Sequence, residues 1–471
     1  MVVGKQPRIP KTGGTLKVNA TAARPKLHPG DDDPSLTAHA GLALTGELVA
    51  RIGLIEGIDA RLGHLKSRRR GLSLGEFVVS MAESVLAGGS YLCDIERLRA
   101  DEAGASLRAV ANPPAPSTAG QLFGRFALPD CWKLERASAE AANRLDEALG
   151  LTPGVITLDA DSTTCETFGA KKKGTGWSHA GVRGYQPFVV SWSERRRFLA
   201  ADLLAANNNP VAVSPRLLRR ALTLLPKGAR AKQLRGDSGF YSADLMAECA
   251  KRGVRFSICA KRTTVIWAEM LSIPRGAWRP ARDMRRAQVA ETTHEVEGVG
   301  TCRLIVRRVE VKASDLPSIK GRRRRTIPKE QLRLASEGRL GKVYCYSAIV
   351  TDLEGTAVDI EAWHRCRVSI EELFKDAKHG HGLAHLPMGR LQPNAVWMQC
   401  CMLAVNLSSM LQQVAGRAVR AHAKRLRSEL ICIPARLVRS GRRVILRLAP
   451  SADKAMFWDL YAAIRAITSS A

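Results

Sequence analysis

The sequence predicts an α/β fold, in which a mixed five-stranded sheet carries helices on both faces. Three β-branched or aromatic runs follow one another between residues 155 and 204, with only short connections. From residue 214 to residue 261, helix-like and strand-like runs alternate. This order of elements is typical of a mixed α/β sheet. We also expect an α-helical N-terminal domain before this sheet and a β-rich insertion that interrupts it.

The charge balance of the chain points to a polyanionic partner. At 471 residues, the chain is long enough for more than one domain and a sizeable core. Lys and Arg total 73 against 44 Asp and Glu, which gives a formal net charge of +29. Such a field attracts polyanions and contributes nothing to folding, so nucleic acid is the expected partner. The length and the 45% hydrophobic content disfavour a ribosomal-type protein.

The cysteines and the apolar segments bear on the compartment. Eleven cysteines are scattered without a CxxC or Cys/His cluster, so neither a zinc site nor a disulfide framework is expected. The basic N-terminus lacks the apolar stretch of a signal peptide. The most apolar segment, residues 395–414, contains three Gln and one Asn and predicts a buried helix. We therefore expect a cytoplasmic, nucleoid-associated protein without membrane contact.

The predicted strands are short and bounded by turn residues. VITLDAD follows Pro153 and Gly154, which marks a buried strand. YQPFVVSWS and RRFLAADLL follow as the second and third strands, and KQLRGD and VRFSICAK as the fourth and fifth. SPRLLRRALTLLP and SADLMAECAKRG are the intervening helices, and the first of them begins with Ser214 and Pro215, as helices often do.

A long connection separates the fifth strand from the next predicted helix. A structureless loop of that length would be improbable. The connection contains the strand-like runs TTHEVEG, CRLIVRRVEVKA and KVYCYSAIVT, so we expect an inserted β-rich subdomain. One helix is then expected over residues 359–380 and another over 394–415, and the tail ends in a strand-like run and an amphipathic helix.

Six parts are expected along the chain. The basic turn KSRRRG, at residues 66–71, lies in the second part and could contact phosphate, although a solvated loop is the better interpretation of it alone. In chain order the parts are a disordered basic segment (1–35), a helical DNA-binding domain (36–150), the first part of the sheet domain (151–261), the insertion (262–352), the second part of the sheet domain (353–415) and a C-terminal region (416–471).

Three carboxylates stand where this fold would bring them together. Thr157, Asp159 and Asp161 share one strand face, because side chains alternate along a strand. Asp237 ends the fourth strand, at the edge where ligand sites of open α/β sheets gather. If the first and fourth strands are neighbours, Asp161 and Asp237 converge, and a crossing helix can bring Glu371 to them. Clustered carboxylates bind hard divalent cations, and two such ions about 4 Å apart promote phosphodiester chemistry.

The alternative for each carboxylate is structural. A single Asp at a strand end is usually a turn or cap residue, and a single Glu on a helix is usually a surface residue. Only the combination of the three, in this order of elements and on a strongly basic chain, favours a metal site.

Several segments resemble a known family. Arg367, Glu371 and Lys378 have the spacing of the Tyr-Arg-Glu-Lys signature of DDE transposases related to insertion sequence four. LDADST, KKKGTGWSHAGVRGYQP and RGDSGFYSADLMAECAKRGVRFSI resemble more specifically the bacterial insertion-sequence-1380 family. The opening LTAHAGLALTGELVARIGL and the closing PARLVRSGRRVILRL resemble the ends of that family, so the resemblance covers nearly the whole chain. The order of elements is similar to that of the ribonuclease-H-like fold.

The resemblance implies roles for particular residues. Asp161, Asp237 and Glu371 would be the catalytic and metal-binding triad, which holds two Mg²⁺ ions or Mn²⁺ in their place. Asp159 is a less favoured substitute for the first Asp. Arg367 and Lys378 would bind DNA phosphates, and their spacing from Glu371 puts all three on one helical face.

Three further positions have two interpretations each. The Tyr of the signature falls on His364, which would donate a hydrogen bond to a phosphate or would be an unrelated helix-start residue. In relatives the insertion helps to form a DNA hairpin, so Trp267 and Trp278 would stack on a base or pack inside the insertion. Lys171, Lys172 and Lys173 would grip the DNA backbone or form an exposed hairpin.

The expected function is cut-and-paste DNA transposition of an insertion sequence. The partners would be double-stranded DNA, both the terminal inverted repeats and the target, bound by a homodimer or a larger assembly. The alternatives are another ribonuclease-H-like nuclease and a transposase-derived DNA-binding protein without catalysis. The insertion and the Arg-Glu-Lys helix disfavour the first alternative, and the three intact carboxylates disfavour the second.

Overall fold

The structure is a computed structural model that describes residues 27–66, 70–151, 154–417, 420–451 and 453–468. It divides into two compact units, Met1–Pro34 and Ser35–Ala471, and the second holds every helix and strand below. Most of the segment expected to be disordered, residues 1–26, lies outside the described residues. So do residues 67–69 of the basic turn.

Residues 36–150 form a short strand and a group of helices. The first two helices are separated at Gly53, which adopts a left-handed backbone with φ of 57°. The third helix begins with a capping box, in which Ser73 and Glu76 bond to each other's backbone N–H groups. The elements are β1 (Leu36–Thr37), α1 (Leu42–Arg51), α2 (Leu54–Leu62), α3 (Leu74–Leu86), α4 (Ile95–Ala100), α5 (Pro116–Phe123) and α6 (Leu128–Ala148).

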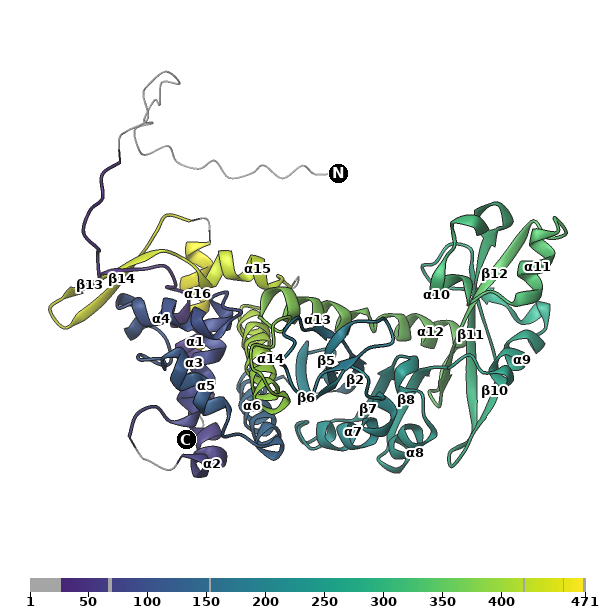
Figure 1. The fold of residues 1–471 in the computed structure, drawn as a ribbon, viewed down its shortest axis with the longest axis horizontal. Coiled ribbons are helices and arrows are strands. Elements are labelled where there is room, and N and C mark those ends of the chain that lie inside the picture. The colour runs from purple at the N-terminus through teal and green to yellow at the C-terminus, as the bar shows by residue number, and fades with distance from the viewer. Residues whose placement is uncertain (1–26, 67–69, 152–153, 418–419, 452, 469–471) are drawn as a thin grey trace, which may run out of the picture. The chain divides into compact units, whose positions relative to one another are not determined.

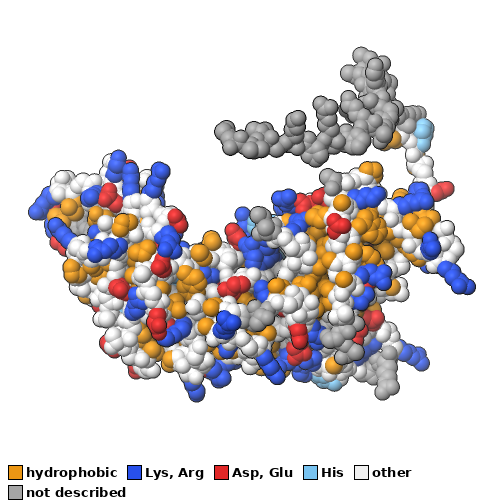
Figure 2. Space-filling view, turned by 180° about the vertical axis from the view of Figure 1, so that it is seen from behind, with side chains coloured by type: hydrophobic (Ala, Val, Ile, Leu, Met, Phe, Trp, Pro, Cys, Tyr) orange, Lys and Arg blue, Asp and Glu red, His pale blue; other side chains and the backbone are white. Residues whose placement is uncertain are grey.

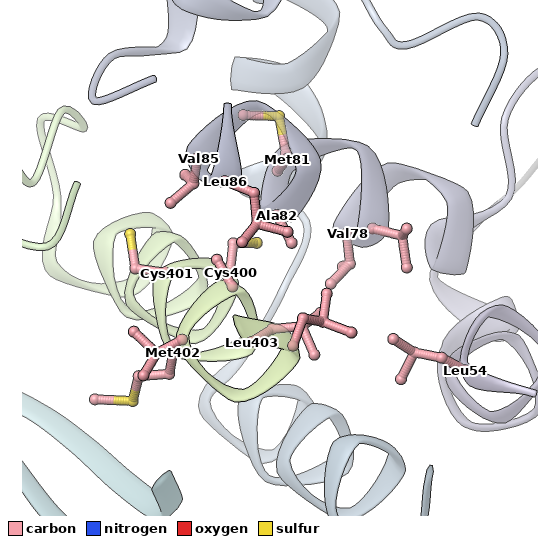
Figure 3. Close-up of a cluster of buried hydrophobic side chains, with 14 of the residues drawn as sticks. Leu54, Val78, Met81, Ala82, Val85, Leu86, Cys400, Cys401, Met402 and Leu403 are labelled. Carbon is pink, nitrogen blue, oxygen red and sulfur yellow. The ribbon is translucent and has the colours of Figure 1, made fainter. Parts of the chain in front are cut away.

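These helices pack around α14 (Leu391–Val414), which is buried along most of its length. Figure 3 shows apolar side chains of α3 facing those of α14, such as Ala82 near Cys400. This burial explains why the most apolar stretch of the sequence is also interrupted by amides: Asn406 bonds to both backbone groups of Phe198. Among the residues that the structure describes, no helix is long and apolar enough to cross a membrane.

All five predicted strands are present and adjacent in one mixed sheet (Figure 1). The first three form an antiparallel meander, and the fourth and fifth run parallel to the first. Their order across the sheet is β6-β5-β2-β7-β8, and the short strands β3 (Cys165–Glu166) and β4 (Gly176–Trp177) also pair with β5. The five are β2 (Val155–Ser162), β5 (Arg183–Trp192), β6 (Arg197–Ala205), β7 (Ala231–Gly236) and β8 (Val254–Cys259).

The prediction of five strands is too small, because the sheet has eleven strands within the described residues. The strands of the insertion continue the sheet beyond β8, since Ile349–Thr351 pair antiparallel with Ser257–Cys259. Pairing between segments about 90 residues apart leaves no local signal in the sequence. The insertion consists of α9 (Thr264–Ser272), β9 (Arg279–Pro280), β10 (Ala287–Val296), β11 (Gly300–Lys312), α10 (Gly321–Arg324), α11 (Lys329–Ser336) and β12 (Lys342–Thr351).

Helices cover both faces of the central strands (Figure 1). On one face, Leu158 and Ala160 of β2 share a core with α7 (Ser214–Leu222) and α8 (Ala243–Lys251). The opposite face carries α12 (Ala357–Arg365), α13 (Val368–Gly380) and α14. The single helix predicted over residues 359–380 is two helices, with the break at Cys366 and Arg367.

The C-terminal region ends in a helix, as the sequence predicts, but the single predicted strand-like run is a hairpin of two strands. The hairpin strand β13 (Ala435–Ser440) pairs with β14 (Arg443–Leu448) and, on its other side, with β1. The two remaining helices are α15 (Ala423–Leu426) and α16 (Lys454–Arg465), and α16 packs beside α1.

Candidate active site

The polar face of β2 looks toward α13. Because side chains alternate along a strand, Leu158 and Ala160 enter the core beneath α7 and α8, while Asp159 and Asp161 face the other way. Asp161 lies at the carboxyl end of the strand, where its Oδ2 is 3.1 Å from the Nη1 of Arg367. Its Oδ1 accepts a hydrogen bond of 2.8 Å from the N–H of Ser162.

Asp237 lies beside Asp161 because their strands run parallel and in register. Ala160 pairs with Gly236, so the following residue of each strand reaches the same edge of the sheet. Asp237 caps the short 3₁₀ turn Ser238–Phe240 by accepting a hydrogen bond of 2.9 Å from the N–H of Gly239. Burial raises the pKa of Asp161 to about 6, because the attraction of Arg367 is outweighed by burial together with the repulsion from Asp237.

Arg367 and Glu371 reach the same place from the start of α13. Arg367 stands at the N-cap position of α13, and its Nη2 is 3.8 Å from the Oε1 of Glu371, one turn along the helix. Burial acts to lower the pKa of Arg367, but the charges of Asp161 and Asp237 raise it above its ordinary value. Arg367 is therefore the cation among three carboxylates, of which Glu371 has a side chain 61% exposed.

The carboxylates have the donor chemistry of a divalent-cation site without its closed geometry. Within the described ranges, no three His, Cys, Asp or Glu side chains lie close enough together to hold a metal ion. The donors still fit a hard cation, because Asp161, Asp237 and Glu371 offer only carboxylate oxygens. The raised pKa of Asp161 comes first from burial and then from the negative charge of Asp237, and the attraction of Arg367 does not offset the two together.

Asp159, two residues before Asp161, is instead part of a closed ion pair. Arg235 of β7 donates to both of its carboxylate oxygens, at 2.6 and 2.9 Å, and the Ser369 hydroxyl donates to one of them at 3.0 Å. Arg235 also donates to the carbonyl of Trp363, at 2.7 Å. This buried network attaches the ends of α12 and α13 to the sheet. The sequence argument missed Arg235, although its position two residues before Asp237 puts both on one strand face.

His364 lies inside the protein, between α12 and β8. Its Nδ1 is 2.8 Å from the Ser257 hydroxyl and its Nε2 is 3.3 Å from the Cys259 sulfur. Burial lowers the pKa of His364 to about 3, so the imidazole is neutral at ordinary pH. It is not brought to the exposed side of the carboxylates.

Lys378 and the three-lysine loop border the site through backbone contacts. The ammonium of Lys378 donates to the carbonyl of Thr164, at 2.7 Å, and to the hydroxyl of Thr163, at 3.1 Å. Lys172 donates to the carbonyl of Leu386, and burial lowers its pKa. Lys171 and Lys173, on either side of it, are exposed.

The two tryptophans of the insertion pack against other side chains. Trp278 is 7% exposed, and the guanidinium of Arg308 lies 3.9 Å from the centroid of its ring. Trp267 is partly buried, with its ring 6.0 Å from that of Tyr346. These contacts favour the packing interpretation, most clearly for Trp278.

A hydrogen-bonded chain that sequence reasoning missed joins the insertion to the segment after Asp237. The Tyr241 hydroxyl is 2.9 Å from Nε2 of His294, whose Nδ1 is 2.8 Å from the carboxylate of Glu269. The three residues come from the turn after β7, from β10 and from α9. Their separation in sequence left no spacing pattern from which this contact could be found.

Comparison with known proteins identifies the family. A solved piggyBac transposase synaptic complex with hairpin DNA has a TM-score of 0.41 and 9% sequence identity, over 83% of this chain and 79% of that chain. No curated protein matches the sequence. A family model described as "Transposase DDE domain group 1" matches residues 23–469. The chain therefore belongs to the DDE transposase family of group 1.

Proposed function

We propose that this DDE transposase is of the bacterial insertion-sequence-1380 type and carries out cut-and-paste transposition. In this proposal it cleaves DNA at the terminal inverted repeats of its element and joins the freed ends to a target duplex. The observation that carries the proposal is the adjacency of Asp161 and Asp237 at two parallel strand ends, with Arg367 and Glu371 above them on α13. The likeness to ribonuclease H is supported by the strand order β6-β5-β2-β7-β8.

Asp161, Asp237 and Glu371 are the proposed cation ligands. When bound, Mg²⁺, or Mn²⁺ in its place, would activate a water or a 3′-hydroxyl and stabilise the leaving oxygen. The surroundings of Asp161 favour it over Asp159 as the first ligand, because Asp159 already satisfies both oxygens through Arg235. Glu371 is the ligand with most freedom to move, since it is the most exposed of the three.

Arg367 is the proposed phosphate contact closest to the carboxylates. Its guanidinium has the planar geometry that suits a phosphate. Its present carboxylate partners would be shared with incoming cations, which releases Arg367 to bind the DNA backbone. Lys171 and Lys173 are proposed to contact the backbone further along, because both are exposed while Lys172 braces their loop.

Lys378 has a mainly positioning role in this proposal. It holds Thr163 and Thr164, the residues that follow the end of β2, against α13. His364 is better described as a buried support beneath α12 than as a phosphate ligand, because both of its ring nitrogens already have internal partners.

Strand cleavage tests the proposal. A DNA fragment that carries the ends of the element is incubated with the protein, with Mg²⁺ or with EDTA. Cutting at the ends should need the metal and should be lost in Asp161→Asn, Asp237→Asn and Glu371→Gln while DNA binding survives. Matched controls are Asp244→Asn in the first turn of α8 and Glu372→Gln, an exposed neighbour of Glu371, which should both cut normally.

Three outcomes would change the proposal. Cutting by Asp161→Asn but not by Asp159→Asn would move the first ligand to Asp159. Binding of the ends without cutting, with either Mg²⁺ or Mn²⁺, would favour a DNA-binding protein that has lost its chemistry. Metal-dependent cutting without preference for the ends would favour another nuclease of this fold. The homodimer or larger assembly is tested by the mass of the complex on paired ends.

A further inference from the structure

The hairpin β13–β14 concentrates positive charge without any acidic residue. Residues 431–452 contain five arginines and no Asp or Glu. Four of these arginines are exposed and have no hydrogen-bond or ion-pair partner among the residues that the structure describes. We call them the hairpin arginines: Arg439, Arg442, Arg443 and Arg447.

The geometry of the hairpin presents these charges outward. A two-residue turn, in which Gly441 has a φ of 59°, joins the strands, and such turns keep a hairpin narrow. The base of the hairpin is fixed: the N–H of Leu437 donates to the carbonyl of Ser35, and Leu446 and Leu448 pack on the helical core. Figure 2 shows Lys and Arg side chains at the free end of this region, on the right of the view.

The hairpin also leaves apolar side chains exposed between its charges. Val444 and Ile445 are 56% and 38% exposed. They lie on β14 between Arg443 and Arg447, so this strand presents both charge and apolar area to a partner.

The hairpin β10–β11 gives the contrast within the same chain. There a half-buried arginine, Arg303, pairs with Glu291 on the neighbouring strand, and Glu295 accepts a hydrogen bond from Thr301. Acidic and basic side chains are therefore interleaved on that hairpin and neutralise each other. For the four hairpin arginines, no acidic partner stands among the described residues, so their counter-charge has to come from elsewhere.

We propose that the β13–β14 hairpin is a second DNA-binding surface, which contacts the phosphate backbone of duplex DNA through the hairpin arginines. A two-stranded ribbon fits a groove of the duplex, and guanidinium groups suit phosphates. The six-residue strands extend for about 20 Å, enough to follow several phosphates. The inference rests on the proposed function, since it takes DNA as the partner, but it assigns contacts away from the carboxylates.

The salt dependence of binding to a short duplex of arbitrary sequence, in EDTA, tests the inference. The variant replaces all four hairpin arginines by Gln, and its matched control replaces four other exposed cations by Gln. These control residues lie on α6, in the connection between α7 and β7, and at the end of α8: Arg136, Lys227, Arg230 and Lys251. Each lost phosphate contact removes roughly 0.9 from the slope of log affinity against log salt, so the hairpin variant should lose about 3 to 4. The control should lose less than about 1.

Further variants separate charge from folding. Replacing the hairpin arginines by Lys keeps the charge, so it should keep most of the slope. If the Gln variant loses its thermal transition, Arg442→Gln and Arg443→Gln are measured singly at the turn, where each should remove about 1 from the slope. Equal losses in the hairpin and control variants would overturn the inference, because net charge alone would then explain binding.

The remaining outcomes are also decisive. An unchanged slope overturns the inference, and if the oligomeric state without DNA changes at the same time, the surface serves a second copy of the chain. The proposed function fails separately: if the protein never cuts its ends but the hairpin variant loses the slope, the inference holds and the transposition proposal does not. If cutting depends on the carboxylates while the hairpin slope is unchanged, only the inference fails.

Discussion

Asp159 lies at the interior end of the polar face of β2, and Asp161 lies at its carboxyl edge. Both point toward α13 from the same strand, two residues apart. Asp159 is fully buried and bonded to the guanidinium of Arg235 through both of its oxygens. Asp161 shares its cation, Arg367, with two other carboxylates.

The difference lies in the local balance of charge. At the interior end, one carboxylate meets one guanidinium, so the pair is neutral and holds the helices on the sheet. At the edge, Asp161, Asp237 and Glu371 outnumber Arg367 three to one. A buried carboxylate is stable only when its charge is compensated, so the surplus at the edge supports the proposed cation site there.

The interior pair should be the more sensitive to loss of its cation. Arg235→Met leaves Asp159 buried without a counter-charge and removes the bond to the carbonyl of Trp363. We expect it to lower the free energy of unfolding by about 3–5 kcal/mol, as for other broken buried pairs. Urea unfolding, followed by circular dichroism, measures this change.

The control for Arg235→Met removes both charges of the interior pair. The double variant Asp159→Asn/Arg235→Met should recover a large part of the lost stability, because no unpaired charge remains. If Arg235→Met alone lowers the free energy of unfolding by less than about 1 kcal/mol, the Asp159–Arg235 pair does not stabilise the fold in the way that this comparison with the edge requires.

Substitution of the edge carboxylate should raise the free energy of unfolding, where substitution of Arg235 lowers it, and the gain should depend on pH. The folded-state pKa of Asp161 is raised to about 6, so its charged form destabilises the fold. The destabilisation by ionised Asp161 is absent below the pKa of the unfolded chain, near 3.8, and grows as the pH rises to about 6. Asp161→Asn removes this penalty, so at pH 7 the variant should be more stable than the wild type by roughly 2–3 kcal/mol.

The pH series needs a metal-free buffer and then a metal-containing one. Without metal, the difference in unfolding free energy between Asp161→Asn and wild type should vanish near pH 4 and grow toward pH 6. Addition of Mg²⁺ at pH 7 should stabilise the wild type but not the variant, since bound cations compensate the carboxylates. A difference that does not change with pH would show that Asp161 is not the strained carboxylate.

The strands could be predicted from the sequence because their signal is local. The β-branched run 155–161 and its bounding turn residues indicate a buried strand without reference to any other part of the chain. The order of elements then put Asp161 and Asp237 at neighbouring strand ends, and the register of β2 with β7 agrees with that expectation. Spacing along a helix likewise put Arg367 and Glu371 one turn apart.

Contacts between distant segments could not be predicted in the same way. Nothing near Asp159 in the sequence shows that Arg235 neutralises it, so the strand pattern alone did not separate the two aspartates, and only the family resemblance favoured Asp161. The break between α12 and α13 was missed because the apolar periodicity continues across Cys366. The burial of His364 depends on Ser257 and Cys259 of β8, which lie more than 100 residues away.

A smaller effect is expected at His364, which lies close to Arg235 at the interior end and to Arg367 at the edge. We expect His364→Phe to lower the free energy of unfolding by about 2 kcal/mol, since the buried hydroxyl of Ser257 loses its partner. The double variant Ser257→Ala/His364→Phe should recover part of this loss. The salt slope of DNA binding should not change in either variant, and a fall of about 1 would restore His364 as a phosphate ligand.

Lys378 should show the smallest effect and the sharpest separation between stability and activity at the edge. Lys378→Met removes the donor to Thr163 and Thr164 at the end of β2, so we expect a loss of about 1 kcal/mol in the free energy of unfolding. Since the segment that carries Asp161 is then held less firmly, the rate of end cleavage should fall by about ten-fold or more. Lys378→Arg keeps a donor at the tip of a long side chain, so it should restore part of that rate. If Lys378→Met instead loses DNA affinity without loss of rate, Lys378 binds phosphate and does not position the strand end.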